Sequence, residues 1–285
     1  MGAKWFLCPD GGVTEIAKCL DKGGCRMGQR CATVPYLRMV GYDREWHGIS
    51  PSSAGTGPRQ IYLKQVTDYV ISPDDRAFAA LGTAVHAKLD LQAYTRNVFS
   101  EEKLSDEEMR GISDVLEEDE AAPDSYVLSD YKTWGSYKVK KAMGVYQIDA
   151  PCLDEECNPI FLKSGPNKGQ PKTKKEVVID PAKADLKNEK LQLNRYRIFF
   201  ESLGFPISRM QIQTITRDGN TYMANSRGID RSINIIEVPR MDDAEVLAYY
   251  DGLKKEVDDA FLTGKSRICD AWESWDGKCC LSCSR

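Results

Sequence analysis

Apolar and polar residues follow periods along this chain that predict a series of helices and strands. After Pro73, apolar residues recur in steps of three and four at Phe78, Leu81, Val85 and Leu89, which predicts a helix with one buried stripe. Other helices are predicted over about 59–64, from a Ser105 cap with Glu108 three residues on, over 186–203, and from Asp242 to about Gly264. Strands are predicted over 112–116, 126–131, 207–217 and 231–238. We therefore expect an α/β fold with a mixed central sheet flanked by helices.

Cysteine and lysine positions divide the chain into three predicted parts. Residues 1–48 form a Cys-rich N-terminal segment, residues 49–264 a core, and residues 265–285 a Cys-rich tail that packs on the core. Within the core, about 150–185 is predicted to be an insertion, because it contains Cys152, Cys157 and the lysine-rich, Pro- and Gly-containing stretch 163–175. Lys163, Lys168, Lys172, Lys174 and Lys175 form either part of a DNA groove or a solvated loop.

Composition narrows the classes of protein that fit. The chain has 285 residues, is 41% hydrophobic and 29% charged, and has a formal net charge of −4, so any nucleic-acid contact must come from local patches. No run of 18 apolar residues is present and the first apolar stretch is too short for a signal peptide, so we expect no membrane contact and a cytoplasmic location. Ten cysteines in such a chain indicate metal or iron–sulfur binding rather than disulfides.

The clearest chemical pattern is the segment Tyr126–Thr133, where an apolar, strand-like run ends in Ser-Asp-Tyr-Lys-Thr. Residues two apart on a strand share a face, so Asp130 and Lys132 are predicted to point into one cleft. A carboxylate there suits Mg²⁺ or Mn²⁺, and a lysine can orient water or offset charge on a reacting phosphate. Asp-x-Lys on a strand is common, so this motif alone is weak.

Three further motifs lie around it in order. They are Leu81-Gly-Thr-Ala-Val-His86 on the predicted helix, Gly111-Ile-Ser-Asp114 at the start of a strand, and Gln192-Leu-Asn-Arg-Tyr196 on a later helix. Together with Asp130-x-Lys132-Thr133, this order resembles the RecB-like nucleases of the PD-(D/E)XK superfamily, the branch that includes CRISPR-adaptation exonucleases and exonuclease V-type enzymes. The resemblance covers about residues 49–240, with Ser113 at the position of the superfamily's proline.

The resemblance implies a restriction-endonuclease-like core and a role for each motif residue. His86, Asp114 and Asp130, with the carbonyl of Tyr131, would be ligands of Mg²⁺ or Mn²⁺, and Lys132 would be the catalytic lysine. Gln192 and Tyr196 would stabilise the site or contact the DNA backbone. Each residue also has a plainer interpretation: His86 and Tyr196 as core residues, and Asp114 as one acid in an acidic stretch.

The cysteines suggest a second metal centre. Cys269, Cys279, Cys280 and Cys283 lie in the tail, and Cys280-x-x-Cys283 has ligand-like spacing. Iron–sulfur members of the branch have three C-terminal cysteines and a fourth before a Pro-Arg at the start of the core, where this chain has Gly57. The missing ligand could come from Cys8, Cys19, Cys25 or Cys31. The alternatives are a [4Fe–4S] cluster that joins the tail to one N-terminal cysteine, one or two Zn²⁺ sites, or unligated thiols.

The function expected from these residues is metal-dependent hydrolysis of DNA phosphodiesters. No separate target-recognition domain is evident, which favours an exonuclease on DNA ends or single strands, in recombination, repair or the processing of phage or mobile-element DNA. The alternatives are a non-catalytic DNA-binding or scaffold protein that keeps the fold, and a structure-specific endonuclease. Protein partners are not indicated.

Overall fold

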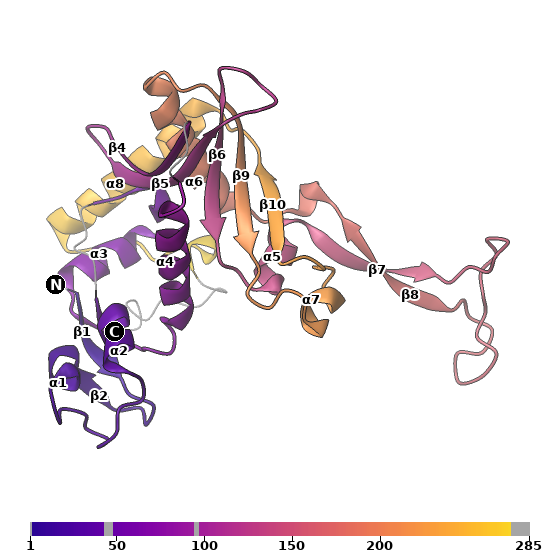
Figure 1. Ribbon diagram of the computed structural model, residues 1–285, viewed down its shortest axis with the longest axis horizontal. Helices are drawn as coiled ribbons and strands as arrows, with labels where there is room; N and C mark the ends of the chain where they lie inside the picture. Colours follow the sequence, from indigo (N-terminus) through magenta and orange to yellow (C-terminus); the bar gives the residue numbers. More distant parts are fainter. Residues whose placement is uncertain (1, 43–47, 94–96, 275–285) are drawn as a thin grey trace. The chain divides into compact units, whose positions relative to one another are not determined.

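The computed structural model describes residues 2–42, 48–93 and 97–274 of the chain (Figure 1). The chain divides into two compact units, which we describe separately. The first unit contains residues 1–130, 187–211 and 237–285, and the second contains 131–186 and 212–236. The boundaries between the units fall within three of the strands.

A small three-stranded sheet forms the N-terminal part of the first unit. Its order is β2-β1-β3, with β1 (Ala3–Leu7) antiparallel to β2 (Val13–Glu15) and parallel to β3 (Tyr69–Ile71), so this sheet is mixed. Two short helices accompany it, α1 (Ile16–Leu20) and α2 (Val34–Gly41). One apolar cluster joins these elements to the helix that follows β3; its buried members are Phe6, Cys19, Leu37, Val40, Ile71 and Ala80.

A five-stranded sheet of order β10-β9-β6-β5-β4 is the main sheet of the chain (Figure 1). Its strands are β4 (Val98–Ser105), β5 (Arg110–Glu118), β6 (Tyr126–Lys132), β9 (Ile207–Ile215) and β10 (Ile233–Val238). β4 pairs antiparallel with β5, and β5 antiparallel with β6. Four of these strands were predicted from sequence, and β4 was not.

Four helices complete the first unit: α3 (Pro58–Val66), α4 (Ala77–Asp90), α6 (Lys187–Ser202) and α8 (Asp243–Thr263). The predicted cap of the last helix is confirmed, because the Asp242 side chain accepts a hydrogen bond from the Glu245 amide. That helix ends at Gly264, whose φ of 69° is the left-handed conformation typical of a helix C-terminus. Mixed α/β architecture with helices around sheets is therefore what the sequence predicted.

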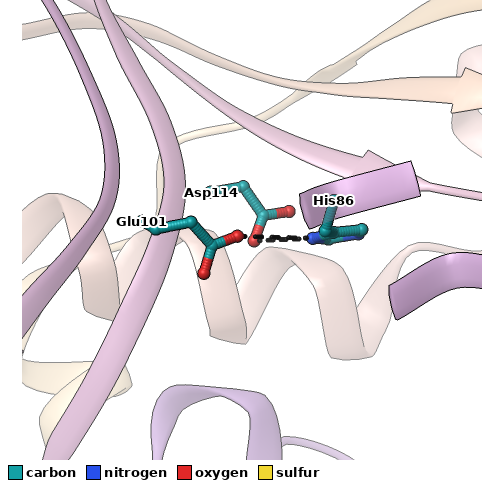
Figure 2. Close-up of side chains that lie close together, drawn as sticks. All are labelled: His86, Glu101 and Asp114. Atoms are coloured by element: carbon teal, nitrogen blue, oxygen red, sulfur yellow. Dashed lines mark ion pairs between the residues drawn. The ribbon is translucent and has the colours of Figure 1, made fainter. Parts of the chain in front are cut away.

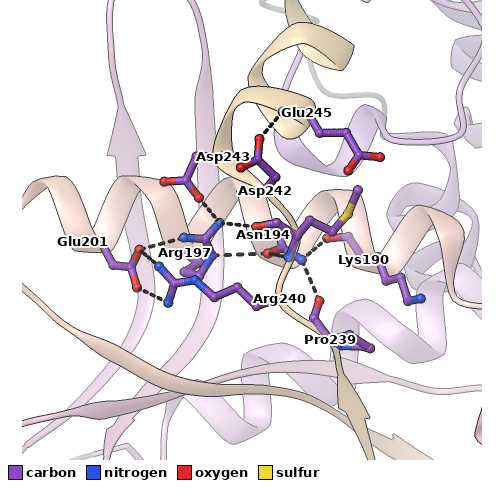
Figure 3. A network of polar contacts seen from close by, with 10 residues as sticks. Lys190, Asn194, Arg197, Glu201, Pro239, Arg240, Asp242, Asp243 and Glu245 are labelled. Atoms are coloured by element: carbon purple, nitrogen blue, oxygen red, sulfur yellow. Dashed lines mark hydrogen bonds and ion pairs between the residues drawn. The ribbon is translucent and has the colours of Figure 1, made fainter.

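A buried arginine fixes α6 against the start of α8 (Figure 3). The Arg197 side chain is fully buried, and its guanidinium donates to Asn194 Oδ1, to Glu201 Oε2 at 2.7 Å and to Asp243. Asn194 in turn donates to the Pro239 carbonyl and accepts from the Met241 amide. A buried guanidinium is tolerated only with partners of this kind, so the network sets the rotation of α6 about its axis.

The second unit contains two short helices and a long two-stranded hairpin (Figure 1). The helices are α5 (Ser136–Ala142) and α7 (Tyr222–Ser226), and the hairpin consists of β7 (Val145–Pro151) and β8 (Thr173–Ile179). Val139, Val145 and Ile229 form its buried cluster. The region expected to be an insertion is thus largely a β-hairpin, with isolated bridges Leu153↔Pro159 and Phe161↔Pro171 beyond its strands.

Two sequence predictions in the first unit are wrong. Ser105 does not cap a helix; it ends β4, and residues 106–109 turn into β5, with Asp106 Oδ1 accepting from the amides of Glu108 and Met109. A polar side chain that accepts hydrogen bonds from the next backbone amides occurs in tight turns as well as at helix N-termini. The stripe on α4 is not buried either, since Phe78 is 60% exposed and Leu81 45%, and α4 packs through Ala80 instead.

The tail is docked as far as Ser274 by ordinary contacts. Arg267 forms a two-pronged ion pair with Glu273, with both N···O distances 2.7 Å, and a further pair with Glu256 of α8. The Lys187 ammonium lies 3.5 Å from the ring centroid of Trp272, which also packs against Tyr249. Among the residues that the structure describes, no helix is long and apolar enough to cross a membrane.

Candidate metal centre and active site

His86 lies in the third turn of α4, a helix rich in alanine, the residue with the highest helix propensity. The imidazole is about one quarter exposed, with 27% of the side chain accessible. The helix thus presents a titratable, partly accessible nitrogen ligand rather than a core histidine.

The β4–β5 hairpin places two carboxylates opposite each other. Ser100 pairs with Val115 and Glu102 with Ser113, so Glu101 and Asp114 occupy facing positions in the same register. Facing residues of an antiparallel pair point to the same side of the sheet and lie close together. Like charges in facing positions repel, which favours a cation between them.

His86, Glu101 and Asp114 converge from the helix and the two strands (Figure 2). His86 Nδ1 lies 3.5 Å from Asp114 Oδ1 and 3.8 Å from Glu101 Oε1. One donor atom from each of the three lies within 4.8 Å of the other two, which is the spacing of ligands around a single ion. The structure therefore brings the predicted pair His86 and Asp114 together and adds Glu101.

Glu101 has a backbone conformation that is unusual for a strand residue. Its φ is +51°, in the left-handed region that side chains other than glycine rarely adopt. Such a conformation costs on the order of 1–3 kcal/mol and persists at functional sites where the surroundings enforce it. At this position it interrupts the β4–β5 ladder at the one residue that faces Asp114.

Asp130 extends the row onto the third strand. Val115 pairs with Ser129, and the next positions along the two antiparallel strands are Asp114 and Asp130, which therefore face the same side of the sheet. The Asp130 carboxylate is buried, with 3% of the residue exposed, and its Oδ1 accepts a hydrogen bond of 2.9 Å from Gln192 Nε2. Glu101, Asp114 and Asp130, which we call the carboxylate row, occupy adjacent positions on β4, β5 and β6.

Tyr196, one helical turn after Gln192 on α6, is buried beneath this row. Burial raises the pKa of its phenol well above the ordinary value, and the negative charges of Asp130 and Asp114 raise it further. The ring also lies against Gly111, where an added Cβ would come within 2.7 Å of Tyr196 Cε1. Tyr196 is therefore a neutral hydrogen-bonding group, and Gly111 is required because nothing larger fits.

Tyr131 and Lys132 end β6 and belong to the second unit. That Lys132 shares a face with Asp130 stays a prediction, which rests on strand alternation. Tyr131 and Lys132 are both partly exposed. The role of the Tyr131 carbonyl as a ligand stays a prediction.

The donor set fits a divalent cation. Glu101 and Asp114 offer the hard oxygen ligands that Mg²⁺ and Mn²⁺ prefer, and the imidazole adds a nitrogen that suits Mn²⁺ better than Mg²⁺. Asp130, on the next strand, is not part of the group that converges within 4.8 Å. Bringing Glu101 and Asp114 together on facing positions is unfavourable without positive charge between them. A bound cation removes that repulsion, so the residues present are consistent with a metal site.

Sequence reasoning missed Glu101. Glu101 can be predicted as a site residue only if β4 is predicted, because the tight turn at 106–109 then pairs position 101 with position 114. The incorrect prediction of a helix cap at 105–108 excluded that pairing. The acidic stretch Glu101-Glu102 showed no motif of its own.

Among the described residues, no three of the predicted cysteine ligands come within 4.8 Å of one another. Cys8, Cys19, Cys25 and Cys31 lie within or beside the small N-terminal sheet and its helices. Cys269 follows α8 in the chain, and its side chain lies against Gly57, the residue before α3. A Cβ added to Gly57 would come within 2.4 Å of the Cys269 sulfur. Cys279, Cys280 and Cys283 lie outside the described residues, so a centre shared between the tail and an N-terminal cysteine stays a prediction.

No protein-family model matches the chain, and no curated protein matches it. Among solved structures, one described as "Crystal structure of SSO0001" aligns with 12% identity and a TM-score of 0.37, over 84% of this chain and 86% of its own. A similarity this low carries no argument about fold or activity.

Proposed function

We propose that this chain is a metal-dependent deoxyribonuclease with a PD-(D/E)XK-type core. The observation that carries the proposal is the carboxylate row on three adjacent strands with His86 beside it. Acidic residues in a row, an imidazole beside them and Lys132 two residues after Asp130 are the groups that hydrolysis of a phosphodiester with a divalent cation needs.

In this proposal each residue of the site has a separate role. Glu101, Asp114, Asp130 and His86 would hold the cation, which supplies Lewis acidity and a water of lowered pKa. Gln192 orients Asp130 through its hydrogen bond, and is thus a positioning residue. Lys132 would orient the attacking water and offset the charge that develops on the phosphate. Tyr196 stays protonated and donates a hydrogen bond without adding charge.

A surface of the second unit supports DNA as the substrate. Trp134, Tyr137, Lys138, Lys141 and Arg227 form what we call the aromatic–basic face. The Lys138 ammonium lies 5.0 Å from the Trp134 ring centroid, and Lys141 4.8 Å from that of Tyr137, whose side chain is 56% exposed. Trp134 is partly buried against the apolar cluster of the second unit, so Tyr137 is the exposed ring of this face. An exposed ring beside cations can bind single strands through base stacking and phosphate contacts.

The finer form of the proposal is an exonuclease that acts on DNA ends or single strands, in recombination, repair or phage and mobile-element DNA processing. A cytoplasmic location belongs to it, because cysteines stay reduced there. A [4Fe–4S] cluster at Cys269, Cys280 and Cys283, with Zn²⁺ as the alternative, is proposed on the resemblance alone. In place of the branch's usual fourth cysteine this chain has Gly57, against which the Cys269 sulfur lies.

The test is cleavage of labelled DNA by the full-length protein with Mn²⁺ or Mg²⁺. Linear and circular molecules, single- and double-stranded, separate exonuclease from endonuclease activity. Asp114→Asn and Asp130→Asn should each reduce the rate by at least about a thousandfold, because a missing ligand removes the stabilisation of the transition state. Mn²⁺ should support a higher rate than Mg²⁺ at equal concentration.

Asp251→Asn is the matched control, since Asp251 is an exposed carboxylate on α8. This variant should cleave at the wild-type rate. A wild-type protein that binds DNA but leaves every substrate intact with both ions would instead establish the scaffold alternative.

A further inference from the structure

Four of the ten cysteines lie within the 24 residues from Cys8 to Cys31. We call residues 3–41, which contain β1, β2, α1 and α2, the cysteine module. Cys8 directly follows β1, Cys19 lies in α1, and Cys25 and Cys31 lie in the loop between α1 and α2. None of these four thiols takes part in the candidate active site.

The module has little regular structure to hold it. α1 has only five residues, and the loop over residues 21–33 contains no helix or strand. Helices this short are unstable alone, and loops of about 12–15 residues without regular structure are uncommon unless they bind something. The apolar cluster that includes Phe6 and Leu37 anchors β1, α1 and α2, but none of its buried members lies in the 21–33 loop. Cys25 and Cys31 are free thiols, so no disulfide holds this loop.

Two arginines hold the cysteine-bearing loops together. Arg26, beside Cys25, forms an ion pair of 2.5 Å with Asp10, two residues after Cys8. Arg30, beside Cys31, donates to the carbonyls of Cys19 and Asp21. The residue next to Cys25 is thus tied to the Cys8 turn, and the residue next to Cys31 to α1.

The thiols also influence one another. Burial raises the pKa of the Cys19 thiol, and Cys25, Cys31 and Cys8 each raise it further by their negative charge. In the described part of the chain, however, only His86, Glu101 and Asp114 meet within 4.8 Å as a set of ligands, so the four sulfurs must move closer to share an ion.

We propose that Cys8, Cys19, Cys25 and Cys31 bind one structural Zn²⁺ as a tetrahedral four-thiolate site. Each thiol loses its proton on binding, so four protons leave and the site with its ion has a net charge of −2. Arg26 and Arg30 lie beside the ligands and offset that charge. Four sulfur ligands in a closed site without an open position are characteristic of structural zinc. The site would close the 21–33 loop onto β1 and α1.

The experiment measures metal per chain in full-length protein in which Cys269, Cys279, Cys280 and Cys283 are all changed to Ser. This background removes any ion held by the tail. Elemental analysis should find one zinc per chain. Adding Cys25→Ser or Cys31→Ser should lower that value to less than half, whereas adding Cys152→Ser or Cys157→Ser, in the second unit, should leave it unchanged.

Cobalt substitution identifies the ligand atoms from the visible spectrum, in a variant that keeps its ion. Co²⁺ added to the metal-free tail-substituted protein should give the intense visible bands of tetrahedral four-sulfur coordination. Cys31→His, at an exposed position, should keep one ion and shift these bands to those of a three-sulfur, one-nitrogen site. Iron in place of zinc, octahedral cobalt bands, or zinc content unaffected by Cys25→Ser and Cys31→Ser would each overturn the proposal. None of these measurements involves nuclease activity.

Discussion

At the candidate centre, two carboxylates of like charge lie close together and repel each other. Glu101 and Asp114 occupy facing positions on β4 and β5, and His86 lies within 4 Å of both carboxylates. The left-handed backbone of Glu101 adds strain to this repulsion. A site built in this way is less stable without its ion than a neutral version of the same site.

Glu101→Gln should therefore have opposite effects with and without metal. Without metal, the variant should be at least as stable as the wild type in thermal unfolding with EDTA, because one repelling charge is gone. The affinity of the variant for Mn²⁺ should fall by at least about tenfold. Loss of a residue that only hydrogen-bonds to a metal ligand already lowers metal affinity by about that factor, and loss of a ligand should lower it at least as much. Isothermal titration with Mn²⁺ in the absence of DNA measures the affinity.

Glu102→Gln is the matched control, because Glu102 is the next carboxylate on β4, is exposed, and by alternation points to the other face. It should bind Mn²⁺ as the wild type does. Equal Mn²⁺ affinity in both variants would remove Glu101 from the ligand set.

Gly111 makes a second prediction at this scale, since it provides room for Tyr196. Gly111→Ala should lower the free energy of unfolding by about 1–3 kcal/mol, because the new Cβ would lie 2.7 Å from Tyr196 Cε1 and 2.8 Å from Pro51 Cδ. Gly252→Ala on α8 has open space and should instead raise it by about 0.5–1 kcal/mol. Urea unfolding of both variants measures the two changes, and a stabilised Gly111→Ala would contradict the packing described for Tyr196.

Elements differ in how far the sequence predicts them. α8 was predicted closely because its two ends are set by local chemistry, the Asp242 cap and Gly264. β4 was missed because its polar residues lack alternation, and its place depends on pairing with β5 across the 106–109 turn. Asp114 and His86 lie in short sequence motifs and were predicted from them. Glu101 lies in no motif, so only the pairing of β4 with β5 places it opposite Asp114. The α4 stripe failed because periodicity shows which residues share a face, but not whether anything covers it.

The turn between β4 and β5 contains a charge pair that should make stability depend on pH. Asp106 accepts from two turn amides and pairs with Arg195 of α6, whose side chain is 5% exposed. Burial acts to raise the pKa of Asp106, but the hydrogen bonds from Arg195 and from the Glu108 and Met109 amides outweigh it and lower the pKa below 3.8. The pair therefore joins the hairpin that carries Glu101 and Asp114 to the helix that carries Gln192.

Asp106→Asn should destabilise the fold by about 1–2 kcal/mol near neutral pH, a modest value because the Asp106 side chain is 39% exposed. A carboxylate whose folded pKa is lowered contributes its stability above the unfolded pKa and loses it as the pH falls through the folded value. The difference between wild type and variant should thus be full at pH 6 and shrink toward zero below about pH 4. Urea unfolding over this range measures it, and a constant difference at every pH would show that the ion pair is not its cause.

Charge is distributed unevenly over the whole molecule. The net charge of −4 for the chain conceals a second unit with 13 Lys and Arg against nine Asp and Glu. The first unit, which contains the carboxylate row, is correspondingly acidic. Composition could not predict this difference, because the second unit is assembled from two separate stretches of the chain, 131–186 and 212–236.

If the second unit binds DNA, the aromatic–basic face should account for much of the salt dependence of binding. In an Asp130→Asn background, which should prevent cleavage, Lys138→Glu with Lys141→Glu should weaken binding of a short oligo-dT by about tenfold or more at low salt. The slope of log affinity against log salt concentration should become shallower by about 1–2, because fewer counterions are released from the phosphates. Fluorescence anisotropy over a range of salt concentrations measures both quantities.

The matched control reverses two exposed lysines of the first unit, Lys255→Glu with Lys265→Glu, so that the total charge changes by the same amount. If binding responds only to total charge, both double variants will lose affinity equally and the aromatic–basic face has no special role. If the face binds DNA, the control will keep nearly the wild-type slope. Tyr137→Leu in the same background should then weaken binding without changing the slope, because a stacking ring holds bases by contact and not by charge.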